Sequence, residues 1–165
     1  MELNLCRDAE ASGSLKPDST GRVWRLETLE TTRSLGEELA LALPRNAILL
    51  LQGPLGAGKT SLVQGIAQGC GIDEPITSPT FALAQHYPQG QPPLVHLDLY
   101  RLEVAGSADE LFLQEEEESR AMGALMAVEW PERLGLDLPE AWRLELCHAG
   151  EGRRAQLSPP RNRTT

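Results

Sequence analysis

The chain contains three short apolar runs, each bounded by polar residues, at 47–51, 94–99 and 124–128. They alternate along the chain with segments whose apolar residues recur at helical spacing. A continuous apolar run of this length is typical of a strand that is buried on both faces. Helical spacing predicts a helix over 59–68 and an earlier one from Ser34, where a capping-box pattern stands, to Pro44. The alternation predicts an α/β fold, with a mostly parallel sheet flanked by helices.

The two ends of the chain follow other patterns. Apolar and polar residues alternate on both sides of a glycine-containing turn within 142–157, which predicts a small C-terminal antiparallel hairpin. Residues 1–22, rich in serine, glycine and charge, are expected to be a flexible leader, and 158–165 a loose tail. We therefore expect one domain over 23–157.

The composition excludes several classes of protein. No apolar run approaches the roughly 18 residues of a membrane span, so none is expected. Asp and Glu total 24 against 15 Lys and Arg, a net charge of -9 that repels a phosphate backbone unless the basic residues cluster. The three cysteines are odd in number and widely spaced, and with the three histidines they show no zinc-like spacing. This pattern favours a reduced, cytoplasmic setting.

The strongest chemical signal is the sequence Gly-Pro-Leu-Gly-Ala-Gly-Lys-Thr at 53–60, between a predicted buried strand and a predicted helix. It matches the phosphate-binding pattern G-x-x-x-x-G-K-[ST]. Glycines let successive backbone amides turn toward phosphate oxygens, and the helix adds the positive end of its dipole. Lys59, one of only two lysines in the chain, is expected to reach the β- and γ-phosphates, and the Thr60 hydroxyl can bind magnesium. The pattern predicts nucleotide binding.

The next two apolar runs each end at an acidic residue, Asp98 and Glu129. Ligands of an open α/β sheet bind beyond the carboxyl ends of its strands. These two carboxylates are therefore expected to flank the phosphate loop, where they can hold magnesium or position water. The alternatives are an aspartate that starts a turn and an exposed glutamate before a proline turn. His96 shares a strand face with Asp98 and is expected to be a half-buried histidine rather than a general base.

Three further segments each have two interpretations. Ser-Pro-Thr-Phe at 78–81 is either a hydroxyl-bearing switch segment that contacts the γ-phosphate or a simple proline turn. Trp130 either packs on the sheet edge or covers the nucleotide. The four consecutive glutamates at 115–118 are more typical of a solvated helix face than of a metal cage.

The order of these motifs resembles that of the TsaE (YjeE) family. After 53–60 come Ser-Pro-Thr-Phe at 78–81, His-Leu-Asp-Leu-Tyr-Arg-Leu at 96–102 and Val-Glu-Trp-Pro-Glu at 128–132, so the resemblance extends over about 23–157. These are small bacterial ATPases of the tRNA threonylcarbamoyladenosine pathway. The resemblance implies a parallel nucleotide-binding core with a small antiparallel addition, and ATP with Mg²⁺. It also implies work with TsaD-like and TsaB-like subunits, which transfer the threonylcarbamoyl group to adenosine 37 of tRNA, so that this chain meets tRNA only indirectly.

The resemblance further implies roles for single residues. Those expected to bind the cofactor are Leu55, Gly56, Ala57, Gly58, Lys59, Thr60 and Arg153. Mg²⁺ would be held by Thr60, Asp98 and Glu129, and the residues expected to act in catalysis are Asp98, Glu129 and Thr80. Leu29 matches a segment that lies near the adenine.

Two other functions share these motifs. A small-molecule kinase can be built on the same loop, but such kinases usually carry an arginine-rich lid, and here the arginines are scattered with no obvious lid insertion. A nucleotide-dependent switch that binds partners and rarely hydrolyses is equally compatible with the motifs. Phosphate release with and without partner subunits distinguishes the switch from an ATPase.

Overall fold

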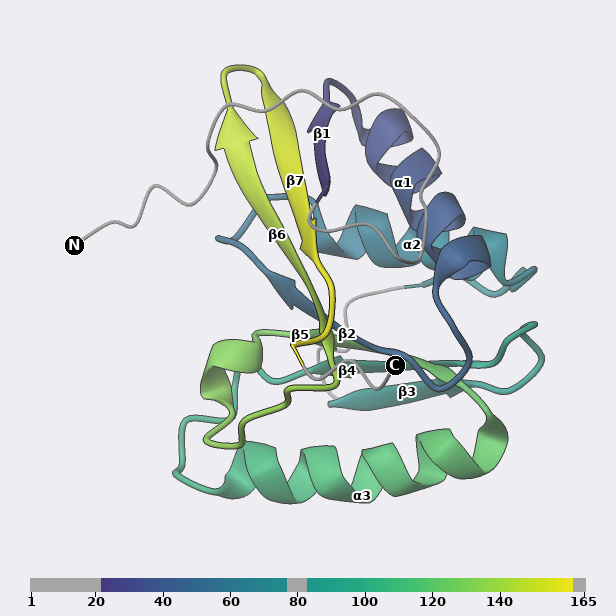
Figure 1. The fold of residues 1–165 in the computed structure, drawn as a ribbon, viewed down its shortest axis with the longest axis vertical. Coiled ribbons are helices and arrows are strands. Elements are labelled where there is room, and N and C mark those ends of the chain that lie inside the picture. The colour runs from purple at the N-terminus through teal and green to yellow at the C-terminus, as the bar shows by residue number, and fades with distance from the viewer. Residues whose placement is uncertain (1–21, 77–82, 162–165) are drawn as a thin grey trace.

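The computed structural model describes residues 22–76 and 83–161, which build one seven-stranded sheet and three α-helices (Figure 1). The strands are β1 (Arg22–Leu26), β2 (Ile48–Gln52), β3 (Ala84–Tyr87), β4 (Leu94–Asp98), β5 (Leu125–Glu129), β6 (Trp142–Ala149) and β7 (Gly152–Ser158). The helices are α1 (Leu29–Ala42), α2 (Lys59–Gly69) and α3 (Ser107–Met122), with a 3-10 turn, η1 (Pro131–Arg133).

The sheet order is β1-β7-β6-β2-β5-β4-β3. The central strands β6, β2, β5 and β4 are parallel, whereas β7 and β1 add antiparallel pairs at one side and β3 at the other. The predicted α/β class, its mostly parallel core and its C-terminal hairpin are therefore confirmed. Strand β3 had no clear signal in the sequence, because an edge strand of four residues carries little hydrophobic pattern.

The sheet separates two apolar layers, with α1 and α2 on one face and α3 on the other (Figure 1). Strand β2 shows the reason for the continuous apolar runs. Leu49 and Leu51 enter the layer beneath α1 and α2, and Ile48 and Leu50 enter the layer beneath α3. A strand covered on both faces has no polar side, so its sequence does not alternate.

Helix α1 begins earlier than the sequence predicts. Thr28 caps it, its side chain accepting a hydrogen bond from the Thr31 backbone N–H while the Thr31 hydroxyl accepts from the Thr28 backbone N–H. The expected start at Ser34 is wrong, because the Ser34 hydroxyl instead donates to the carbonyl of Glu30 inside the helix. A capping box formed by two threonines competes with the predicted one and adds a turn to the helix.

Helices α1 and α2 approach each other backbone to backbone. A Cβ on Gly65 would lie 2.1 Å from the Arg33 carbonyl oxygen, and one on Gly36 would lie 2.3 Å from the Leu62 carbonyl oxygen. Only glycine fits at these two positions. The close contact fixes α2, and with it the loop that precedes α2, against the rest of the domain.

The limits of the domain lie close to the edges of the described residues. Arg22 opens β1 and Ser158 closes β7, so most of the predicted leader (1–22) and the end of the predicted tail (158–165) lie outside them. Within the described residues, no helix has both the length and the apolar character needed to cross a bilayer.

Candidate nucleotide-binding site

The glycine-rich loop connects the end of β2 to the start of α2. Gly53 lies so close to β6 that a Cβ would meet the Leu146 carbonyl oxygen at 2.4 Å. Gly58 takes the N-cap position of α2 with a φ of 101°, a left-handed conformation that side chains rarely adopt, and no side chain caps this end. The first N–H groups of α2 have no partner within the helix, which is the arrangement that binds phosphate groups.

A cavity of about 390 Å³ opens above this loop, at the carboxyl ends of the parallel strands. Its lining contains Leu29, Leu55, Gly56, Gly58, Lys59, Thr60, Ser61, Leu83, Asp98, Tyr100, Arg101, Glu129 and Trp130. The predicted loop residues, both strand-end carboxylates and Leu29 are thus brought together around one space.

Two predicted residues, Ala57 and Arg153, do not line this cavity. Ala57 is a fully buried residue of the loop. Arg153, in β7, donates from Nη2 to the carbonyl of Gly56 at 3.0 Å, so it supports the loop from the side. Thr80, with the rest of the 78–81 segment, lies outside the described residues.

Lys59 is held inside the site. Its side chain is 6% exposed, Nζ donates to the Gly53 carbonyl at 2.7 Å, and Nζ lies 3.7 Å from the centroid of the Trp130 ring. Burial lowers the pKa of Lys59 below its ordinary value, and the nearby carboxylates of Glu129, Glu132 and Asp98 oppose that shift. The ammonium is therefore a poorly solvated charge in contact with the cavity.

Glu129 is not an exposed glutamate before a turn: it is 3% exposed. Its Oε2 lies 2.6 Å from Nε2 of His96, a fully buried side chain, so the expectation of a half-buried histidine is wrong. Asp98 pairs with Glu129 in the β4–β5 register, which puts both carboxylates at the same edge of the sheet. His96 contacts one carboxylate oxygen of Glu129, and Glu129 lines the cavity.

Asp98 combines both of its proposed roles, and Trp130 lines the cavity. The Tyr100 backbone N–H donates to Oδ1 of Asp98 at 3.0 Å, so this aspartate starts a turn and also lines the cavity. Trp130 has a left-handed φ of 60°, and its ring lies over Lys59 and 4.8 Å from the ring of Tyr100. Arg133 donates from Nε to the Tyr100 carbonyl and closes this aromatic rim.

Sequence reasoning assigned no site role to Leu83, Ser61, Tyr100 or Arg101. Tyr100 and Arg101 belong to the motif at 96–102, which was the available signal for them. Ser61 follows the phosphate-loop pattern directly. Leu83 has no sequence signal; it reaches the cavity because its carbonyl accepts a hydrogen bond from the Asp98 backbone N–H at 3.0 Å.

The donor set suits Mg²⁺. Thr60 offers a hydroxyl oxygen and Asp98 and Glu129 offer carboxylate oxygens, and all three residues line the same cavity. Oxygen ligands of this kind, few in number and combined with substrate phosphates, are typical of magnesium sites.

Comparison with known proteins shows the family to which the chain belongs. The family model described as "Threonylcarbamoyl adenosine biosynthesis protein TsaE" matches residues 26–156. The chain is similar to tRNA threonylcarbamoyladenosine biosynthesis proteins TsaE from Synechocystis sp., 51% identical over 112 residues (66% of this chain and 69% of that protein), and from Nostoc sp., 42% identical over 134 residues (79% and 81%). The crystal structure of Bacillus subtilis YdiB superposes with a TM-score of 0.68 at 28% identity, covering 86% of each chain. The chain therefore belongs to the TsaE family.

Proposed function

We propose that this protein binds ATP with Mg²⁺ and hydrolyses it as a subunit of the system that makes threonylcarbamoyladenosine at position 37 of tRNA, in the cytoplasm and together with TsaD-like and TsaB-like subunits. The observation that carries the proposal is a single cavity lined by the phosphate loop, Lys59 and two strand-end carboxylates. Family membership supports the pathway.

The loop residues and Lys59 would bind the triphosphate. The N–H groups at the start of α2 would donate hydrogen bonds to the phosphates, and the positive end of the helix dipole would attract the negative charge of the phosphates. Lys59 has three N–H donors and uses one on Gly53, so it has donors left for phosphate oxygens. Arg153, anchored on Gly56, adds a second positive charge beside the loop.

Glu129 would act at the reacting end of the nucleotide. His96 contacts one of its oxygens and orients the carboxylate, which leaves the other oxygen for a metal ion or for the attacking water. Mg²⁺, held by Thr60, Asp98 and Glu129, would neutralise the charge that develops on the phosphate oxygens. In the reaction, the water oxygen would bond to the γ-phosphorus, and the bond between the γ-phosphorus and the oxygen that bridges it to the β-phosphorus would break. The water proton would leave toward Glu129 or bulk solvent.

The test is Glu129→Gln, which keeps the size of the side chain and removes its charge. We expect hydrolysis in the presence of the partner subunits to fall by about 10²-fold or more. ATP affinity should change by less than about tenfold, because the loop and Lys59 make most of the phosphate contacts. Steady-state phosphate release and calorimetric titration measure the two quantities.

Glu38→Gln is the matched control, since Glu38 is an exposed glutamate in α1 that does not line the cavity. Its hydrolysis should remain close to that of the wild type. Near-normal hydrolysis by Glu129→Gln would contradict the assigned role of Glu129. ATP binding without phosphate release, with and without the partners, would instead identify a nucleotide-dependent switch.

A further inference from the structure

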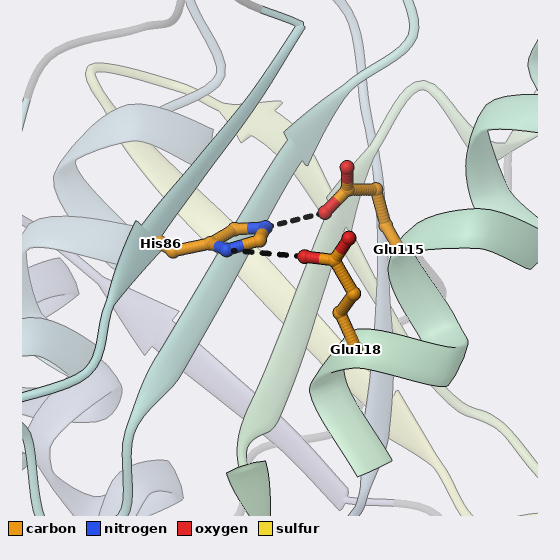
Figure 2. A group of neighbouring side chains, drawn as sticks. All are labelled: His86, Glu115 and Glu118. Carbon is orange, nitrogen blue, oxygen red and sulfur yellow. Dashed lines mark hydrogen bonds and ion pairs between the residues drawn. The ribbon is translucent and has the colours of Figure 1, made fainter. Parts of the chain in front are cut away.

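A second group of ligand-type side chains lies between β3 and α3, away from the nucleotide cavity. His86 comes from the edge strand, and Glu115 and Glu118 come from one face of the helix, three residues apart (Figure 2). Nε2 of His86 contacts Oε2 of Glu115, and Nδ1 lies 3.6 Å from Oε2 of Glu118. One ligand-type atom from each residue lies within 4.8 Å of the others. None of the three lines the nucleotide cavity.

The burial of Glu115 corrects the expectation of a solvated face for one of the four glutamates at 115–118, whereas Glu117 and Glu118 are exposed. Glu115 is 8% exposed, and burying a carboxylate is costly unless a cation compensates it. Arg120 pairs instead with Glu116, at 2.9 Å. Across the described residues, His86 is the one cationic or potentially cationic group within ion-pair distance of Glu115 or Glu118.

The charges at this place do not balance by themselves. Two carboxylates face one imidazole, so the group carries about two negative charges with a neutral histidine and one with a protonated histidine. A divalent cation would bring the group with a neutral histidine to zero. The residue types also restrict the cation, because an imidazole nitrogen favours zinc and similar transition metals over Mg²⁺ or Ca²⁺.

We propose that His86, Glu115 and Glu118 form a binding site for a divalent transition metal ion of the zinc type. One imidazole nitrogen and two carboxylate oxygens are three ligands of a four-coordinate ion, and water fills the remaining position. Zn–N and Zn–O bonds of about 2.0–2.2 Å put ligand atoms at most about 4.4 Å apart. The side chains of His86 and Glu118 are 31% and 51% exposed, so both can make the small shift that this requires.

The ion would join two elements from distant parts of the chain. His86 and Glu115 are 29 residues apart in the sequence, and β3 is an edge strand paired only with β4 among the described strands. Leu83, just before β3, bonds to the Asp98 backbone and lines the nucleotide cavity. A metal at His86 would therefore fix the strand that begins beside the nucleotide site.

The experiment is a calorimetric titration of the full chain, stripped of metal and free of nucleotide, with Zn²⁺. We expect one saturable site whose affinity falls at least about tenfold in His86→Gln and in Glu118→Gln, the loss typical of disturbing a metal site. Zn²⁺ should raise the melting temperature of the wild type but of neither variant. Co²⁺ bound in place of Zn²⁺ should give the visible absorption of nitrogen and oxygen ligation, without a thiolate band.

A control variant tests whether Zn²⁺ binding depends on these three side chains in particular. Glu117→Gln removes the same charge from the same run at an exposed position and should bind Zn²⁺ as the wild type does. Equal affinity in the wild type, His86→Gln and Glu118→Gln would overturn the proposal. So would the absence of saturable Zn²⁺ binding, which would leave His86 as an ion-pair partner of the two glutamates.

Discussion

Replacing Lys59 by methionine should weaken ATP binding without lowering the free energy of unfolding. Methionine keeps most of the apolar stem and removes the charged end, together with its hydrogen bond to Gly53 and its position over the Trp130 ring. The lowered pKa of Lys59 means that burial disfavours its ammonium more than the carboxylates of Glu129, Glu132 and Asp98 favour it. The charge therefore costs stability in the nucleotide-free protein, although it is needed to bind phosphate.

The magnitude follows from the contacts. The hydrogen bond to Gly53 and the position over Trp130 stabilise the ammonium by about 1.5–3 kcal/mol and about 0.5–2 kcal/mol. Desolvation of a buried ion costs several kcal/mol. We expect the free energy of unfolding of Lys59→Met to equal that of the wild type or to exceed it by up to about 2 kcal/mol. ATP affinity should fall by about ten- to a hundredfold, since a charge-assisted phosphate contact of about 1.5–3 kcal/mol is lost.

The pH dependence has a definite sign. Below the ordinary pKa of 10.5, and down to the lowered pKa of the folded state, the unfolded chain binds more protons at this residue than the folded chain does. Wild-type stability should therefore rise with pH through this window relative to that of Lys59→Met.

Urea unfolding and calorimetric ATP titration measure the two effects, and Lys59→Arg is the control. Arginine keeps a charge that cannot be shed on burial, so this variant should be less stable than Lys59→Met. Destabilisation of Lys59→Met by more than about 1 kcal/mol would refute the reasoning, because the contacts of the ammonium would then outweigh its desolvation.

Three further outcomes are expected. Gly65→Ala should lower the free energy of unfolding, measured by urea denaturation, by about 1–3 kcal/mol, because the alanine Cβ would meet the Arg33 carbonyl. Unchanged stability would contradict the close contact between α1 and α2. Burial raises the pKa of Cys70 from 9.0 to about 11, so alkylation at that thiol, followed by peptide mass spectrometry, should be about a hundredfold slower in the folded chain than in urea. With a net charge of -9, the isolated chain should not shift tRNA in a gel at about 150 mM salt, and micromolar binding would contradict this.

The sequence alone determined the features that depend on neighbouring residues. A run such as 47–51 can be buried on both faces only in a sheet covered by helices, and it was predicted as such. The loop at 53–60 was equally readable, because its glycines and Lys59 act through local backbone geometry and one side chain. Asp98 and Glu129 could be placed at one sheet edge, since parallel strands end together.

Only the tertiary structure decided which side chains meet across the fold. The contact of His96 with Glu129 joins residues 33 positions apart, and the Trp130 ring over Lys59 depends on one left-handed backbone angle. Glu115 looked like one glutamate among four until the pairing of β3 with β4 brought His86 against α3. Such contacts depend on strand order, register and helix packing, which are set by the burial of apolar surface over the whole domain, so no local stretch of sequence encodes them.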